Sequence, residues 1–104
     1  MATKLDAQNI RAREALVLPY KRKIASLAIR ADFMKGEMKG KASNDDVRGR
    51  VREAIAEIDA QVQDLADIKF PAETKAAVAQ AEVDKMKASY ADIRKTLEAL
   101  AAAA

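Results

Sequence analysis

Four groups of polar and charged side chains in this sequence have the types and spacings that chemistry requires. Asn44, Asp45 and Asp46 follow one another and offer the oxygen ligands that a hard cation prefers. Glu53 and Glu57 lie four residues apart, which places both carboxylates on one face of a helix. Two basic clusters offer contacts to phosphates or to an acidic partner, and they consist of Lys21, Arg22, Lys23, Arg48, Arg50 and Arg52.

Each acidic group has a simpler structural explanation than metal binding. Ser43 or Asn44 fits the N-cap of a helix, in whose first turn Asp45 and Asp46 would face the positive end of the helix dipole. No EF-hand spacing surrounds this run. The Glu53 pair lacks the Glu-x-x-His motif that carboxylate-bridged metal sites in helical bundles use. We therefore expect no metal and no cofactor.

The residue types that the sequence lacks exclude most catalytic mechanisms. The chain has no Cys and no His, so it offers no thiolate nucleophile, no imidazole base and none of the metal ligands that these residues supply. It also has no glycine-rich phosphate-binding loop. We therefore expect a protein that is not an enzyme and has no small-molecule substrate.

The basic residues concentrate in the first part of the chain. Residues 1–42 carry ten basic and four acidic side chains, a net charge of +6, whereas residues 43–104 carry nine and twelve, a net charge of −3. This asymmetry has three interpretations, which are nonspecific binding of nucleic acid through its phosphates, contact with an acidic partner, and an ordinary solvated surface. The acidic partner could also be the rear of a second copy of the chain. Lys21, Arg22 and Lys23 would project in different directions around a helix, without interleaved aromatic residues to stack on bases, which disfavours nucleic acid.

The composition predicts an all-α fold. Alanine, the strongest helix former, fills 24 of the 104 positions, whereas the chain has three glycines and two prolines. Only four aromatic residues are present, so each residue buries little apolar area and the isolated chain should be marginally stable. We predict one helical domain over residues 1–104, built as a bundle of three to four helices.

The C-terminal half predicts a long antiparallel helical hairpin that resembles a coiled coil. Residues 45–68 and 72–100 carry apolar side chains at spacings of three and four, and Pro71 fits the first turn of the second helix. A connection of two or three residues would fold these helices back on each other. Their facing seams would be Val51, Ile55, Ile58, Val62 and Leu65 on the first helix and Val83, Met86, Tyr90, Ile93 and Leu97 on the second.

The N-terminal half predicts two helices, over residues 4–17 and 19–35, which Pro19 separates. A single helix that is kinked at Pro19 is the alternative. The stretch from Gly36 to Asn44 predicts a loop because it contains two glycines and a Ser-Asn pair. One apolar face of the second helix would consist of Tyr20, Ile24, Leu27, Ala28, Ala31 and Met34.

Ile29 and Phe33 lie on the opposite face of that helix and have two interpretations. If the helix over residues 4–17 folds back over residues 19–35, the pair is ordinary core; otherwise it forms an exposed apolar patch of the kind that marks a binding surface. The seam of the last helix is likewise either covered within the chain or shared between chains. The candidate partner interface therefore consists of Ile29, Phe33, Val83, Met86, Tyr90, Ile93 and Leu97.

These patterns predict a protein that works through packing. No apolar run approaches the roughly 20 residues that span a bilayer, so we expect no membrane segment and a location in the cytoplasm or within an assembly formed there. We expect a protein partner or self-association, as in a structural or assembly subunit such as a virion component, a scaffold or an assembly chaperone. The alternative is a nucleic-acid-associated protein that binds phosphates nonspecifically through its basic N-terminal half.

Overall fold

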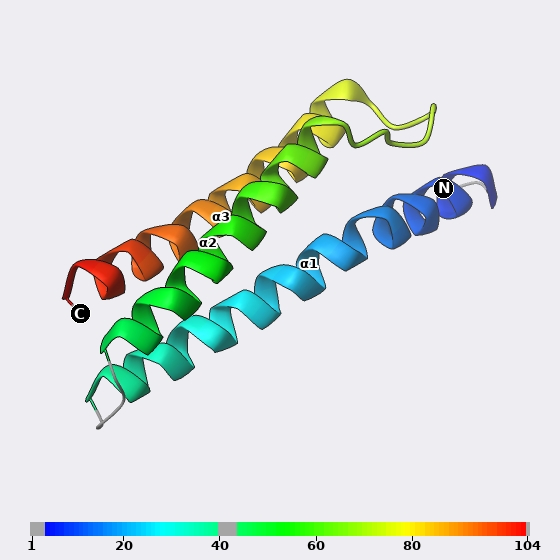
Figure 1. Cartoon of the computed structure of the whole chain (residues 1–104). Helices are drawn as coiled ribbons and strands as arrows, with labels where there is room; N and C mark the ends of the chain where they lie inside the picture. The colour runs from blue at the N-terminus through cyan, green and yellow to red at the C-terminus, as the bar shows by residue number, and fades with distance from the viewer. Residues whose placement is uncertain (1–3, 40–43, 104) are drawn as a thin grey trace.

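The chain forms three α-helices that pack against one another. The computed structural model describes residues 4–39 and 44–103, which comprise α1 (Lys4–Lys39), α2 (Asn44–Ala66) and α3 (Ala76–Ala103). The helices lie side by side, and α2 runs in the opposite direction to α1 and α3 (Figure 1). Each helix contacts the other two, and the molecule is elongated, with principal extents of 57 × 21 × 15 Å. The all-α prediction is confirmed.

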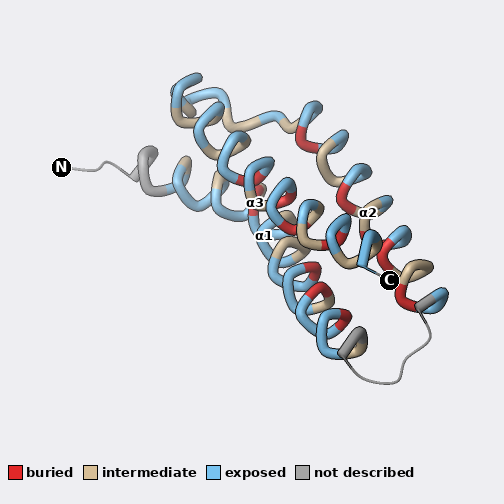
Figure 2. Tube along the Cα trace, turned by 90° about the vertical axis from the view of Figure 1, so that its left-hand side faces the viewer, coloured by how far each residue is buried: buried red, intermediate tan, exposed pale blue. Residues whose placement is uncertain are grey.

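One cluster of buried side chains lies where the three helices meet, and Figure 2 shows these positions turned toward the neighbouring helices. Along each helix they follow one another mostly at spacings of three and four, the period that keeps one face toward the core. The cluster consists of Val17, Leu27, Ala31, Met34, Val47, Val51, Ala54, Ile58, Leu65, Met86, Tyr90, Ile93 and Leu97. Across the described ranges, no helix combines the length and apolar character that a membrane crossing needs.

A single helix replaces the two that were predicted over residues 4–17 and 19–35, because α1 continues through Pro19. Proline has no N–H to donate to the carbonyl of Ala15, and in a helix interior it costs about 3 kcal/mol. Ala15, Leu18 and Pro19 are all exposed, so water can bond the carbonyl that the helix leaves unpaired. Buried side chains on both sides of the proline hold the two halves of α1 to one core.

The loop predicted over residues 36–44 is wrong at its start, because α1 includes Gly36 and continues to the end of its range. A helical glycine costs up to about 1 kcal/mol, which tertiary contacts can offset. Met34 is buried in the core, and Glu37 pairs with Arg50 of α2, so contacts on both sides of the glycine stabilise the helix.

The start of α2 agrees with its sequence signals. The helix begins at Asn44 and carries Asp45 and Asp46 in its first turn, where the helix dipole favours negative charge. Ser43, the other N-cap candidate, lies outside the described residues.

The connection between α2 and α3 is longer than predicted, because it occupies residues 67–75. The helix predicted over residues 45–68 therefore ends earlier than predicted, and the helix predicted over residues 72–100 begins later. The carbonyl of Pro71 accepts a hydrogen bond from the Thr74 N–H at 2.9 Å, so the proline begins a turn and not a helix. Partly buried side chains on the N-terminal side of the proline pack against the core and anchor this connection.

Gly49 offers a test of how freely the outer face of α2 accepts a side chain. A Cβ built at this glycine meets nothing within 4 Å. We expect Gly49→Ala to raise the free energy of unfolding by about 0.5–1 kcal/mol, because alanine loses less backbone freedom in a helix. Urea denaturation measures the change, and Ala60→Gly, at an exposed position of the same helix, should lower stability by a similar amount. A loss of stability in Gly49→Ala would contradict the open space around this position.

Candidate interaction surface

Ile29 and Phe33 form an exposed apolar patch on α1. Their side chains are 69% and 67% exposed, whereas Leu27, Ala31 and Met34 of the same helix are at most 3% exposed. Within residues 4–39 and 44–103 no segment folds back over the pair, because the residues that would have formed the covering helix belong to α1 itself. The interpretation of the pair as ordinary core is therefore wrong, and the chain leaves both side chains in water.

A shallow groove of about 250 Å³ lies beside this patch, between α1 and α2. Its apolar lining is flanked by charged side chains of both helices, an arrangement that is typical of contact sites for proteins. The lining residues are Ile29, Arg30, Phe33, Met34, Arg50 and Glu53.

The chain itself covers most of the other residues that were predicted as a partner interface. Met86, Tyr90, Ile93 and Leu97 of α3 are between 0% and 9% exposed, because they pack in the shared core. Val83 is half-buried and lines a separate depression near the end of α2. Of the predicted interface, Ile29 and Phe33 are the residues that present their side chains to solvent.

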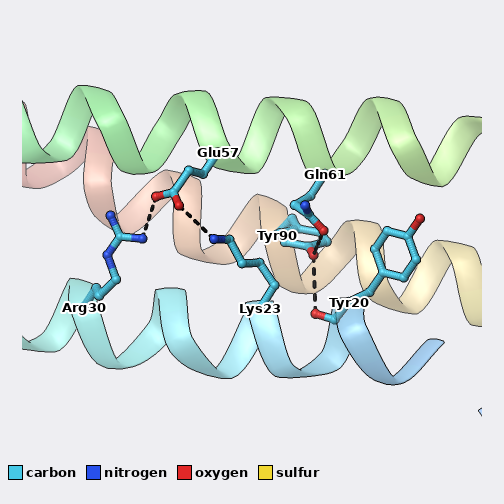
Figure 3. Close-up of polar contacts among 6 residues, drawn as sticks. All are labelled: Tyr20, Lys23, Arg30, Glu57, Gln61 and Tyr90. Carbon is cyan, nitrogen blue, oxygen red and sulfur yellow. Dashed lines mark hydrogen bonds and ion pairs between the residues drawn. The ribbon is translucent and has the colours of Figure 1, made fainter. Parts of the chain in front are cut away.

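A charged bridge joins α1 to α2 next to the core. Glu57 of α2 accepts hydrogen bonds from Lys23 Nζ at 2.8 Å and from Arg30 Nη1 at 2.5 Å (Figure 3). The bond from Lys23, together with the bond and charge of Arg30, lowers the pKa of Glu57 below its ordinary value, although partial burial acts in the opposite direction. One carboxylate on α2 therefore holds two turns of α1 in register.

A second charged bridge lies closer to the C-terminal end of α1 and the N-terminal end of α2. Arg50 Nη1 donates to Glu37 Oε1 at 2.8 Å, and its other terminal nitrogen bonds the second oxygen of the same carboxylate. This two-point hydrogen bonding lowers the pKa of Glu37. Arg50 also donates to Asp46 Oδ2 at 3.0 Å, so one guanidinium links α1 to the first turn of α2.

The basic residues predicted to contact phosphates or an acidic partner are partly engaged within the chain. Lys21, Lys23, Arg48 and Arg50 lie within ion-pair distance of Glu82, Glu57, Asp45 and Glu37, respectively. Arg22 and Arg52 are exposed, and within the described ranges no acidic side chain forms an ion pair with either. A phosphate would have to compete with the acidic neighbours of the first four residues, and contact with a phosphate or an acidic partner stays a prediction.

The acidic residues that were considered for metal chemistry are dispersed. Asp45 and Asp46 each lie beside an arginine of the same helix. Glu53 borders the groove, whereas Glu57 forms the bridge to α1. Throughout the part of the chain that the structure describes, no three His, Cys, Asp or Glu side chains are grouped so that they could hold a metal ion.

Tyr90 has a polar contact that the apolar seam did not predict. Its side chain is fully buried, and its hydroxyl lies 3.3 Å from the Tyr20 carbonyl of α1 and 3.2 Å from Gln61 Oε1 of α2 (Figure 3). The hydroxyl has one hydrogen, so it donates to one of these acceptors at a time. Burial, together with Tyr20 and Asp64 nearby, raises the pKa of Tyr90 to about 12.

We expect Tyr90→Phe to lower the free energy of unfolding by about 1 kcal/mol at neutral pH, because it removes a buried hydrogen bond but keeps the ring. The raised pKa means that folded Tyr90 keeps its proton in a range where the unfolded chain has lost it. The stability of the wild type should therefore fall as pH rises from 10 toward 12, and Tyr90→Phe should show a smaller fall. Urea denaturation across this range measures the effect. Equal alkaline slopes in both proteins would refute the assignment.

We expect Glu57→Gln to lower the free energy of unfolding by about 0.5–1 kcal/mol at neutral pH, a modest value because the ion pairs are partly exposed. A lowered pKa stabilises the fold above the unfolded value of 4.5 and loses this effect as pH falls through the folded pKa. The difference between wild type and variant should therefore shrink in acid, as chemical denaturation at several pH values can measure. Glu98→Gln, which removes the exposed pair with Arg94 within α3, is the control and should change stability less. A difference that stays constant in acid would contradict the role of the Glu57 charge.

The patch and its groove have to be interpreted from their own geometry. Comparisons of the chain with protein-family models, with curated proteins and with solved structures give no match. The surface that stands out is the exposed pair Ile29 and Phe33, which α1 presents on a framework that charged bridges fix to α2.

Proposed function

We propose that this chain is a non-catalytic structural or assembly subunit that acts through helix–helix packing in a larger, multi-copy complex. The observation that carries the proposal is the exposure of Ile29 and Phe33 beside an apolar groove. Burying a large apolar side chain is worth about 1.5–3 kcal/mol. A partner that covers the pair gains free energy that the isolated chain leaves unused.

The internal packing of the subunit would keep the exposed patch of Ile29 and Phe33 in a fixed position. On α3 the buried residues Met86, Tyr90, Ile93 and Leu97 follow one another at alternating spacings of four and three, which is the pattern of a coiled-coil seam. In the proposal, α2 and α3 form a coiled-coil-like antiparallel hairpin, and α1 packs along it. Such a hairpin would hold the patch on α1 in place before any partner arrives, which lowers the entropy lost on binding.

The shape of the molecule also suits assembly. A narrow rod about 57 Å long presents its helix faces along its whole length, so several copies can pack side by side. A virion component, a scaffold or an assembly chaperone would each use such a subunit, in a complex formed in the cytoplasm. The N-terminal part of the chain carries an excess of basic side chains, so it would favour a partner with an acidic surface. Complementary charge increases both the rate and the specificity of association.

The double variant Ile29→Ser/Phe33→Ser tests this proposal. At a concentration low enough for both proteins to be monomeric, the purified variant should keep the helicity and the melting temperature of the wild type, because both side chains are mostly exposed. After mild cross-linking in the source cells, the tagged wild type should elute at a mass several times its own 11.3 kDa, and the variant should elute close to that value. Circular dichroism and size-exclusion chromatography with light scattering measure both outcomes.

Ile10→Ser is the matched control, because Ile10 is a partly exposed apolar residue of α1 outside the patch and is 41% exposed. This variant should elute with the wild type. If the cross-linked wild type elutes as a free chain, or if the double variant remains in the large species, the proposal is wrong.

A further inference from the structure

Between residues 18 and 36, the outer face of α1 carries a stripe of six exposed residues, which we call the α1 stripe. At 3.6 residues per turn they all fall within about 80° of one another, on the side of the helix opposite the core. Leu18 and Ile29 are 42% and 69% exposed, and the other four members are exposed as well. The α1 stripe consists of Leu18, Arg22, Ala25, Ile29, Asp32 and Gly36.

The spacing of the α1 stripe is the same in both directions along the helix. Its members lie nine, five and two residues before position 27 and two, five and nine residues after it. An antiparallel copy of α1 with its two-fold axis at position 27 would therefore place each member opposite another member. The matched pairs are Leu18 with Gly36, Arg22 with Asp32, and Ala25 with Ile29.

Each matched pair is complementary in size or in charge. Leu18 would meet a glycine whose missing Cβ leaves open space, since nothing lies within 4 Å of that position. Ile29 would meet Ala25, so a large side chain again faces a small one, as interdigitating helix surfaces require. Arg22 and Asp32 carry opposite charges, and across the described ranges neither forms an ion pair within its own chain.

From this self-complementarity we infer that the partner of the α1 stripe is a second copy of the chain, paired antiparallel about a two-fold axis near position 27. The inference rests on the proposed function and names the partner of its exposed patch. A different protein would not require the stripe to complement itself. A parallel pair would place Arg22 against Arg22 and Asp32 against Asp32, which like-charge repulsion disfavours.

Phe33 and the groove fit the same arrangement. In the two-fold pair, Phe33 comes level with position 21 of the second copy, one residue from Arg22 of that copy, on the side of α1 that faces α2. A planar guanidinium can lie over an aromatic ring, and the groove beside Phe33 has room for it. Because the α1 stripe faces away from the core, α2 and α3 of each copy lie on the outside of the dimer and do not collide.

Charge exchange across the two-fold axis tests the pairing in the full-length purified chain. Arg22→Asp alone and Asp32→Arg alone each place like charges opposite one another and should raise the dimer dissociation constant by about tenfold or more. The double exchange Arg22→Asp/Asp32→Arg restores opposite charges and should bring the constant back to within about threefold of wild type. Sedimentation equilibrium from about 1 to 200 μM measures the constants, because a contact of this length should dissociate in the micromolar range.

Gly36→Leu gives a second, independent test. The new side chain enters open space in the single chain, but it would collide with Leu18 of the second copy. The variant should keep or gain stability as a monomer and lose dimerisation. Lys95→Asp, an equal charge change at an exposed position of α3, should leave the dissociation constant unchanged.

Three outcomes would overturn the pairing: a wild type that stays monomeric throughout this range, a double exchange that does not recover from the single changes, or open-ended growth with concentration. If the purified chain is monomeric while the cross-linked assembly in cells still depends on Phe33, the self-pairing is wrong and the proposed function stands. If the purified chain dimerises as described but no larger species forms in cells, the pairing stands and the multi-copy assembly is wrong.

Discussion

The burial of one face of α3 against both other helices is the constraint on which the structure depends. Tyr90 lies at the centre of this face, and its hydroxyl approaches the backbone of α1 at Tyr20 and the side chain of Gln61 on α2. A polar atom at this depth needs a partner, so the three helices have to meet at one level along the rod. Because α2 and α3 then share one side of α1, the other side of α1 is left to solvent.

Charged bridges fix the register of α1 against α2, which apolar packing alone specifies only weakly. Apolar side chains can slide past one another by a turn at modest cost, whereas Glu57 meets Lys23 and Arg30 at one position only. The pair Glu37 and Arg50 does the same near the C-terminal end of α1. These bridges pair basic side chains of both helices with carboxylates, so the net charge of the N-terminal part overstates the positive charge that an anion would meet.

Local sequence signals predicted that the chain is helical better than they predicted where each helix ends or which side chains are exposed. The seam of α3 was evident from its period, which both a core and an interface require, so the period alone could not decide which of the two it serves. Pro19 predicted a break that the shared core overrides. Between Val51 and Ile58 of α2 the buried residue is Ala54, whereas Ile55, which the predicted seam included, is only partly buried. The direction of the buried face depends on how closely the neighbouring helices approach. The exposure of Ile29 and Phe33 could not be predicted from a local pattern, because it depends on how the three helices are arranged.

Folding and association are linked because the chain has few aromatic residues and leaves two large apolar side chains exposed. A chain with few aromatic side chains gains little stability from its own core, yet it leaves Ile29 and Phe33 mostly in water. Any partner that binds only the folded state raises the free energy of unfolding. Once the partner's concentration is well above its dissociation constant, each tenfold increase in concentration adds about 1.4 kcal/mol. For a marginal chain this increment is a large part of the total. An outer face of α1 that binds another helix would thus contribute to keeping the chain folded as well as to joining it to its neighbours, and both effects would act on the same few side chains.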